Sequence, residues 1–206
     1  MVYRSVATAA FIALAIQIFA VGILAPRLPR EVCRPGLQQQ RTLTYPATAL
    51  FHIINTDGTV RVTVQPGSEI KVLADIRAYM PTTDTDQIAE QYLSSLFREK
   101  TEDDSTMLLT EPLERPDELD LRVDYAVSVP PGTDVAIDVA NGNVWVDQGC
   151  HQVTVEGNNT DIEILRASGP INAKSTNGRI RIFNAMADTT LETVNGSIKV
   201  DAVGGT

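Results

Sequence analysis

Val135–Val146 reads VAIDVANGNVWV, and similar stretches follow as VTVEGNNTDIEI from Val153, INAKSTNGRIRI from Ile171 and TTLETVNGSIKV from Thr189. The starting positions 135, 153, 171 and 189 are equally spaced, with a constant interval of 18. The seventh residue of each stretch is asparagine, and apolar residues stand three and five places after that asparagine. Self-similarity at a fixed period is the signature of a repeat architecture, so Val135–Gly205 decides the fold.

Apolar and polar residues alternate on both sides of each asparagine, and this period of two indicates strands with one buried face. Glycine follows the asparagine in three of the four repeats, where it can supply the positive φ of a tight turn. A meander of hairpins would not require equal spacing. A β-solenoid does require it, because equivalent residues of successive rungs lie about 4.8 Å apart. We therefore predict an all-β protein built on a single-stranded β-solenoid, or β-helix, with 18-residue rungs.

The predicted register places chemically matched side chains above one another. At the corner of the rungs, the four asparagines would form a ladder of side-chain amides. On the outside, opposite charges on neighbouring strands would each contribute a few tenths of a kcal/mol. These outward neighbours are Glu156–Lys174–Glu192, Asp161–Arg179 and Glu163–Arg181. Lys199 is an exception, because it would lie beside Arg181.

The last repeat predicts an open sheet edge. Only Gly204, Gly205 and Thr206 follow its final strand, and they include no helix or proline that would cover it. An uncovered strand edge invites pairing with another chain. We therefore expect either edge-to-edge self-association at this C-terminal rung or a sequence that is a fragment of a longer protein.

The N-terminal residues 1–25 predict a single-pass membrane anchor. Ser5–Ala25 is an uninterrupted run without a charge, and it is long enough to span a hydrocarbon core of about 30 Å as a helix. A cleaved signal peptide is the alternative, but the run is long for one and Pro26 stands where cleavage after Ala25 would occur. Arginines are more frequent after the segment than before it, which favours a cytoplasmic C-terminus under the positive-inside rule.

Residues 26–47 contain four prolines and a glutamine tract, and we predict that they form a linker. Residues 48–206 are predicted to form the β-solenoid domain. Its first turn is Asp57-Gly58, a further copy of the repeat. The interval from Asp57 to Asn141 is 141 − 57 = 84, which is not a multiple of 18, so an insertion must separate the two copies.

The insertion is predicted to contain both strands and a helix. Alternation predicts strands over Glu69–Tyr79, Thr106–Thr110 and Leu119–Val129. Near residues 84–99 the apolar residues instead recur at spacings of three and four, which predicts an amphipathic helix. We expect this helix to close the open top of the solenoid core. A helix that binds a partner is the alternative.

Composition and motifs argue against several functions. The net charge of −9 and the pI near 4.7 do not suit nucleic-acid binding, which needs a basic surface. The two histidines, His52 and His151, have no further ligands at metal-binding spacing. The sequence contains no nucleophile elbow, phosphate-binding glycine loop or zinc-protease motif. We therefore predict no catalytic, cofactor-binding or metal-binding residues, no cofactor and no enzyme activity.

Some side chains allow alternative interpretations. Four outward carboxylates could suggest the groove of a polysaccharide-cleaving enzyme, but the outward half of a strand alternation explains them better. They are Asp138, Asp147, Asp161 and Glu163. Trp145 either stacks on a sugar or packs under a loop. Cys33 and Cys150 either form a disulfide outside the cytoplasm or remain two thiols.

The order of these features resembles the bacterial putative-adhesin family of uncharacterised β-solenoid domains, the LiaG-like group. The resemblance covers Thr48–Gly205 and rests on Asp57–Val62, the Val129–Gly132 strand end, Thr176–Ile182 and Val194–Val200. It implies a β-solenoid in a cell-envelope setting and carries over no catalytic residues. Family members usually continue for several more rungs, which fits the open edge of the last repeat.

Three functions are compatible with this sequence. The first is a non-catalytic binding, adhesion or scaffold module, anchored in the cell membrane through Ser5–Ala25 with its C-terminal domain outside the cytoplasm, which contacts a protein or a glycan. The second is a cytoplasmic polymer-forming protein of the bactofilin type. The third is a carbohydrate-active β-helix enzyme that would use Asp161 and Glu163.

Overall fold

The computed structural model describes residues 34–80, 93, 95–110 and 119–203. The chain divides into two units, residues 1–32 and 33–206, and all described residues belong to the second. The described residues form ten strands. They are β1 (Arg34–Pro46), β2 (Leu50–Val64), β3 (Glu69–Met80), β4 (Phe97–Glu102), β5 (Ser105–Thr110), β6 (Asp120–Val129), β7 (Asp134–Val146), β8 (Val153–Leu165), β9 (Ile171–Ala185) and β10 (Thr189–Val203). The predicted all-β class is therefore confirmed in this part of the chain.

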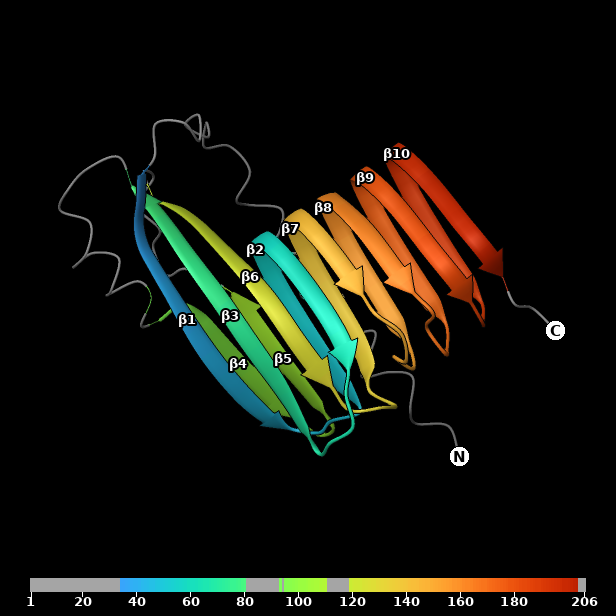
Figure 1. Cartoon of the computed structure of the whole chain (residues 1–206), viewed down its shortest axis with the longest axis horizontal. Coiled ribbons are helices and arrows are strands. Elements are labelled where there is room, and N and C mark those ends of the chain that lie inside the picture. The colour runs from blue at the N-terminus through green and yellow to red at the C-terminus, as the bar shows by residue number, and fades with distance from the viewer. Residues whose placement is uncertain (1–33, 81–92, 94, 111–118, 204–206) are drawn as a thin grey trace. The chain divides into compact units, whose positions relative to one another are not determined.

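The strands are hydrogen-bonded in the order β1-β3-β6-β2-β7-β8-β9-β10, as Figure 1 shows. Strands β1, β3 and β6 pair antiparallel, whereas β6 pairs parallel with β2. From β2 to β10 all neighbours are parallel. We call β2, β7, β8, β9 and β10 the repeat strands, since each carries one copy of the sequence pattern.

Each repeat strand bends at its Asn-Gly position, or at Asp57-Gly58 in β2 and Asn159-Thr160 in β8, and so contributes one arm to each of two layers (Figure 1). The first arm of β2, Leu50–Ile54, pairs with β5, which pairs with β4. Its second arm, Val60–Val64, pairs with β6. The rings of Tyr45 and Phe51 meet across the two layers, with centroids 5.7 Å apart.

The parallel repeat strands share one register. Val135 pairs with Val153, Val153 with Ile171, and Ile171 with Thr189, so the offset predicted from the sequence recurs at every step. Strand β2 stacks on β7 in the same way, but with Asp57 opposite Asn141. The strands β3 to β6 account for the longer interval of that first step, as the sequence predicts.

The core lies between the two layers. On both sides of each bend, alternate residues of β7, β8 and β9 are buried, and most of the corresponding columns are apolar. One column contains Val144, Ile162 and Ile180, each no more than 1% exposed. Branched apolar side chains suit such a column because they pack well on a pleated surface.

At the bend the backbones of successive repeat strands lie so close together that most of these strands need a glycine at that position. A Cβ atom on Gly142 would lie 1.7 Å from the carbonyl oxygen of Gly58, and one on Gly196 would lie 1.8 Å from that of Gly178. The φ angles of Gly58 and Gly142 are 138° and 152°, which side-chain-bearing residues rarely adopt. The chain does not reverse at this point as a hairpin would, since each strand continues through the bend.

Two of our predictions are wrong in part. The linker predicted over residues 26–47 is instead strand β1 from Arg34 to Pro46. Strand β1 is an edge strand, and its prolines lie at its two ends, where a missing N–H does not interrupt a ladder. The helix predicted near 84–99 does not include Phe97–Glu99, which belong to β4 and pair with β5 through a turn at Asp103.

Several other predictions concern residues outside the described ones. These are the membrane anchor of residues 1–25, the linker up to residue 33 and most of the helix near 84–99. Within the described residues, no helix has the length and apolar character needed to cross a membrane. The strands predicted over Glu69–Tyr79, Thr106–Thr110 and Leu119–Val129 are confirmed as β3, β5 and β6.

Substitution of Gly142 tests the close approach at the bend. We expect Gly142→Ala to lower the free energy of unfolding by about 1–3 kcal/mol, since its Cβ meets backbone and its φ is unfavourable. Thermal unfolding followed by circular dichroism measures the effect. Gly67→Ala is the matched control because a Cβ there has nothing within 4 Å. Equal melting temperatures for the two variants would contradict the role of the bend.

Candidate functional site

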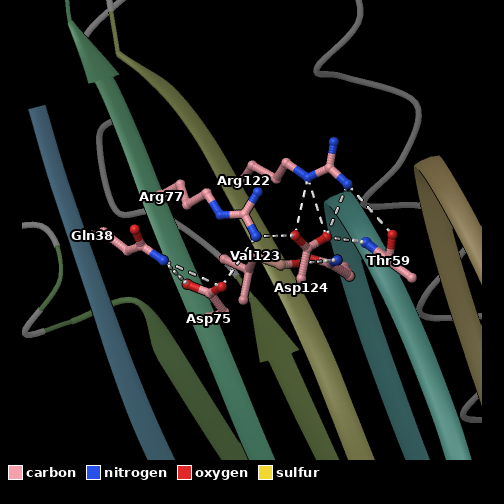
Figure 2. A network of polar contacts seen from close by, with 8 residues as sticks. Gln38, Thr59, Asp75, Arg77, Arg122, Val123 and Asp124 are labelled. Carbon is pink, nitrogen blue, oxygen red and sulfur yellow. Dashed lines mark hydrogen bonds and ion pairs between the residues drawn. The ribbon is translucent and has the colours of Figure 1, made fainter. Parts of the chain in front are cut away.

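The outward face of the second layer carries a network of charged side chains that crosses four strands. Figure 2 shows its members. We define the acid–arginine network as Gln38 of β1, Asp75 and Arg77 of β3, Arg122 and Asp124 of β6, and Thr59 of β2. These residues come together because β1, β3, β6 and β2 are successive neighbours in the sheet.

Asp124 is the central acceptor of this network. One of its oxygens accepts hydrogen bonds from the Thr59 N–H at 2.7 Å and from Arg122 Nε and Nη2, both at 3.1 Å. The other oxygen lies 3.2 Å from Arg77 Nη2. Arg122 also donates to the Thr59 hydroxyl at 3.4 Å. One carboxylate therefore joins β2, β3 and β6.

Asp75 extends the network to the edge strand. It accepts hydrogen bonds from Gln38 Nε2 and from Arg77 Nη2, both at 3.1 Å. The hydrogen bond from Arg77 holds the pKa of the Asp75 carboxyl below its ordinary value, and the hydrogen bond from Gln38 acts in the same direction. With two aspartates and two arginines the network carries no net formal charge, and its contacts connect the four strands to one another.

A second row on the same face has a different character. Leu73 of β3, Ala126 of β6 and Arg61 of β2 are exposed neighbours in the sheet, and the half-buried Trp145 of β7 follows Arg61. We call these four residues the aromatic row. The Arg61 guanidinium lies 4.8 Å from the Trp145 ring centroid, a cation–π contact. An aromatic ring beside a cation and apolar carbons suits contact with a sugar ring or an extended peptide.

The carboxylates that could have suggested an enzyme groove have other partners. Arg179 lies 3.6 Å from Asp161, and Arg181 lies 3.9 Å from Glu163. Asp161 also accepts the Arg179 N–H at 2.7 Å. These contacts confirm the predicted charge pairs between neighbouring strands. Lys199 lies beside Arg181 in the register, and its ammonium contacts Asp201 at 3.0 Å instead.

The predicted asparagine ladder is confirmed at the bend. Asn159 donates to the Asn141 side-chain oxygen at 2.8 Å, Asn177 to Asn159 at 2.9 Å, and Asn195 to Asn177 at 2.9 Å. Every amide therefore donates towards β2. Such a ladder couples the four strands on their exposed corner without competing with the backbone hydrogen bonds.

The outward face of the first layer carries the row Asp138, Glu156, Lys174 and Glu192, and His52 of β2 lies diagonal to Asp138. His52 Nε2 lies 2.7 Å from Asp138, and Lys174 Nζ lies 3.0 Å from Glu192. Burial raises the pKa of Glu156, as does the neighbouring Asp138, while Lys174 and His52 oppose the shift. The partner of His52 was not predictable from sequence spacing, because 86 residues separate the histidine from Asp138.

The remaining histidine and the described cysteine also have defined surroundings. His151 Nδ1 lies 2.7 Å from Asp134 at the start of β7. Cys150 is a free thiol without solvent exposure, and its burial raises its pKa to about 12. Cys33 lies outside the described residues. Among the residues that the structure describes, no three His, Cys, Asp or Glu side chains are grouped as metal ligands would be.

Comparison with solved structures shows a related fold. A putative cell adhesion protein from Clostridium sporogenes superposes with a TM-score of 0.54 at 9% identity, covering 82% of this chain and 99% of that one. Putative adhesins from Bacteroides fragilis and Parabacteroides merdae align with TM-scores of 0.32 and 0.31 at 13% and 9% identity. These two alignments cover 80% and 81% of this chain and 97% of each of the others.

The likeness to the Clostridium sporogenes protein extends over nearly the whole of that protein and shows a shared fold. The other two structures superpose less closely. No protein-family model matches the sequence, and no curated protein is recognisably similar to it. In its described residues the chain is therefore all-β, with the fold of a structure named for cell adhesion.

Removal of the central carboxylate tests the acid–arginine network. We expect Asp124→Ala to lower the free energy of unfolding by about 1–3 kcal/mol, because two guanidinium groups and a backbone N–H lose an ionised acceptor. Urea unfolding measures the loss. Glu69→Ala is the control, since the Glu69 carboxylate is exposed and lies 3.9 Å from exposed Lys71, and its loss should cost less than about 0.5 kcal/mol. Equal costs for both variants would show that the network does not stabilise the sheet.

The raised pKa of Glu156 predicts a pH-dependent effect of its replacement. A folded-state pKa above the unfolded value means that stability is lost as pH rises through the folded pKa. Glu156→Gln should therefore raise the melting temperature more at pH 7 than at pH 4, where the wild-type carboxyl becomes protonated. Glu69→Gln, at an exposed position, should show a smaller difference. A Glu156→Gln variant that is less stable at pH 7 than at pH 4, relative to wild type, would contradict the prediction.

Proposed function

We propose that this protein is a non-catalytic binding, adhesion or scaffold module of the bacterial cell envelope. In this proposal Ser5–Ala25 anchors the chain as a single membrane span, and the domain that begins with β1 at Arg34 lies outside the cytoplasm. The domain is a β-solenoid of 18-residue rungs and belongs to the LiaG-like group. The constant register of β7 to β10 supports the solenoid.

The observation that carries the proposal is the unbroken outward face of the second layer. It extends over eight strands from β1 to β10, and it combines the balanced charges of the acid–arginine network with the aromatic row. A continuous face of this kind suits an extended protein or glycan partner, because successive strands present side chains at regular intervals of about 4.8 Å. The fold shared with the putative cell adhesion protein from Clostridium sporogenes is compatible with this function.

A binding experiment tests the aromatic row directly. Purified protein is incubated with envelope fractions, namely membranes and peptidoglycan sacculi, from the cells that produce it, and bound protein is measured after sedimentation. We expect Trp145→Ala to weaken binding about tenfold, or roughly 1.4 kcal/mol. Glu192→Ala on the first layer is the control and should bind like wild type. Absence of binding by the wild-type protein to every fraction would overturn the proposal.

Protease treatment of intact cells tests the localisation separately. Digestion of the folded domain by protease added from outside, or after the outer layers are permeabilised, is the expected result. A cytoplasmic marker protein must remain intact in the same sample. Protection of the domain after permeabilisation would place it in the cytoplasm and refute an envelope location.

A cytoplasmic polymer of the bactofilin type is the second candidate. The exposed edge of β10 favours it, since a free edge can add strands from another molecule. The arginines that follow Ala25 favour a cytoplasmic C-terminus as well. Electron microscopy of the purified chain discriminates between the two functions: filaments would support the polymer, and their absence at high concentration would exclude it.

A further inference from the structure

Arg61 of β2 differs from four other arginines on the outward face of the second layer, because each of those lies next to a carboxylate. These four are Arg77, Arg122, Arg179 and Arg181. Arg61 is exposed, and within the described residues its guanidinium forms no ion pair. It lies instead over the Trp145 ring, 4.8 Å from the centroid. Arg61 therefore places a positive charge on this face that the neighbouring side chains do not balance.

The Trp145 indole adds a second donor without a partner. Its Nε1 atom is buried and finds no hydrogen-bond acceptor in the part of the chain that the structure describes. Arg61 cannot supply one, because a guanidinium group only donates. A buried polar group without a partner costs free energy, so its presence in a folded protein calls for an explanation.

We propose that Arg61 and Trp145 form a binding site for an acidic glycan, with one carboxylate of the glycan as their common acceptor. The guanidinium and the indole N–H both only donate, so the group that complements them must accept, and an ionised carboxylate does. Arg61 leaves the ring to bind this carboxylate through two hydrogen bonds, and the uncovered indole N–H donates to the same group. This inference rests on the binding function proposed above and names its ligand class.

The surroundings of the pair suit a sugar. Ala126 and Leu73 follow Arg61 in the aromatic row, and they present apolar carbons on which a sugar ring can pack. Two residues farther along β2 and β6 lie the half-buried Thr63 and Ser128, with their hydroxyls 3.4 Å apart. These hydroxyls can both donate and accept, as sugar hydroxyls do.

An acidic peptide fits this part of the face less well. The backbone N–H and C=O groups of a peptide need hydrogen-bond partners, and an extended peptide finds them at the edge of a sheet. Arg61 lies in β2, which pairs with β6 on one side and β7 on the other, so the backbone there is already paired. The net charge of −9 also favours a glycan with widely spaced carboxylates over a densely charged polyanion.

The fluorescence of the purified full chain tests the site, because Trp145 is the only tryptophan in the sequence. The probe is a hyaluronan tetrasaccharide, which carries a carboxylate on alternate rings, and its methyl ester is the matched neutral probe. We expect the tetrasaccharide to change the Trp145 emission saturably, since the guanidinium leaves the ring. The ester should bind about tenfold more weakly or less, because it offers no ionised acceptor.

Variants of each residue separate the two roles. Arg61→Gln should weaken binding of the tetrasaccharide about tenfold or more, and Arg61→Lys, which keeps the charge without the planar fork, should lie between this variant and wild type. Trp145→Phe keeps a ring without the N–H, and calorimetry should show binding weakened about fivefold. Arg41→Gln is the matched control and should bind like wild type, since Arg41 of β1 also lies over a ring, that of Phe97, at 5.7 Å.

The outcomes distinguish failure of this inference from failure of the proposed function. Binding to envelope fractions without binding of the tetrasaccharide would overturn the acidic glycan and leave the binding module standing. Binding of the tetrasaccharide without binding to any fraction would do the reverse. Equal binding of the ester, or of a capped peptide of alternating glutamate and alanine, would overturn the ligand class. Unchanged binding by Arg61→Gln would overturn the site.

Discussion

The structure depends on the close stacking of backbones where the repeat strands bend. At this corner the carbonyl of Gly58 lies where a Cβ of Gly142 would be, and Gly178 and Gly196 repeat the contact. The asparagine ladder ties the same corner from outside. Because the corner fixes each strand relative to the next, it fixes the register of both arms. The apolar columns and the outward charge pairs follow from that register.

The two ends of the stack differ in how they are covered. Beside β2, the inserted strands β5 and β4 extend the first layer, and β6, β3 and β1 extend the second. Aromatic contacts between these layers, Tyr45 with Phe51 and Phe97 with Tyr125, fill the core at this end. At β10 the same core columns reach an exposed edge. The inserted strands explain why the interval from β2 to the next repeat is so much longer than the intervals between the later repeat strands.

The outward faces use polar side chains in two ways. Between the parallel strands, charges alternate at one offset and each pair contributes little, because these side chains are half exposed. Between β1, β3, β6 and β2, the acid–arginine network gathers ionised groups around Asp124, and it joins strands that are far apart in sequence. The aromatic row lies beside this rigid network. A binding surface built on such a framework would be held in place before a partner arrives.

The sequence by itself determined the constant offset between the repeats, the asparagine ladder, the inward columns and the charge pairs, since each concerns neighbours at one fixed interval. It also indicated that an insertion follows Asp57. Only the tertiary structure decided that Arg34–Pro46 is a strand, that Phe97 begins β4, and that His52 meets Asp138. These features arise where strands pair across long and irregular separations. No local period encodes such pairings, because closure of the two layers around one core selects them.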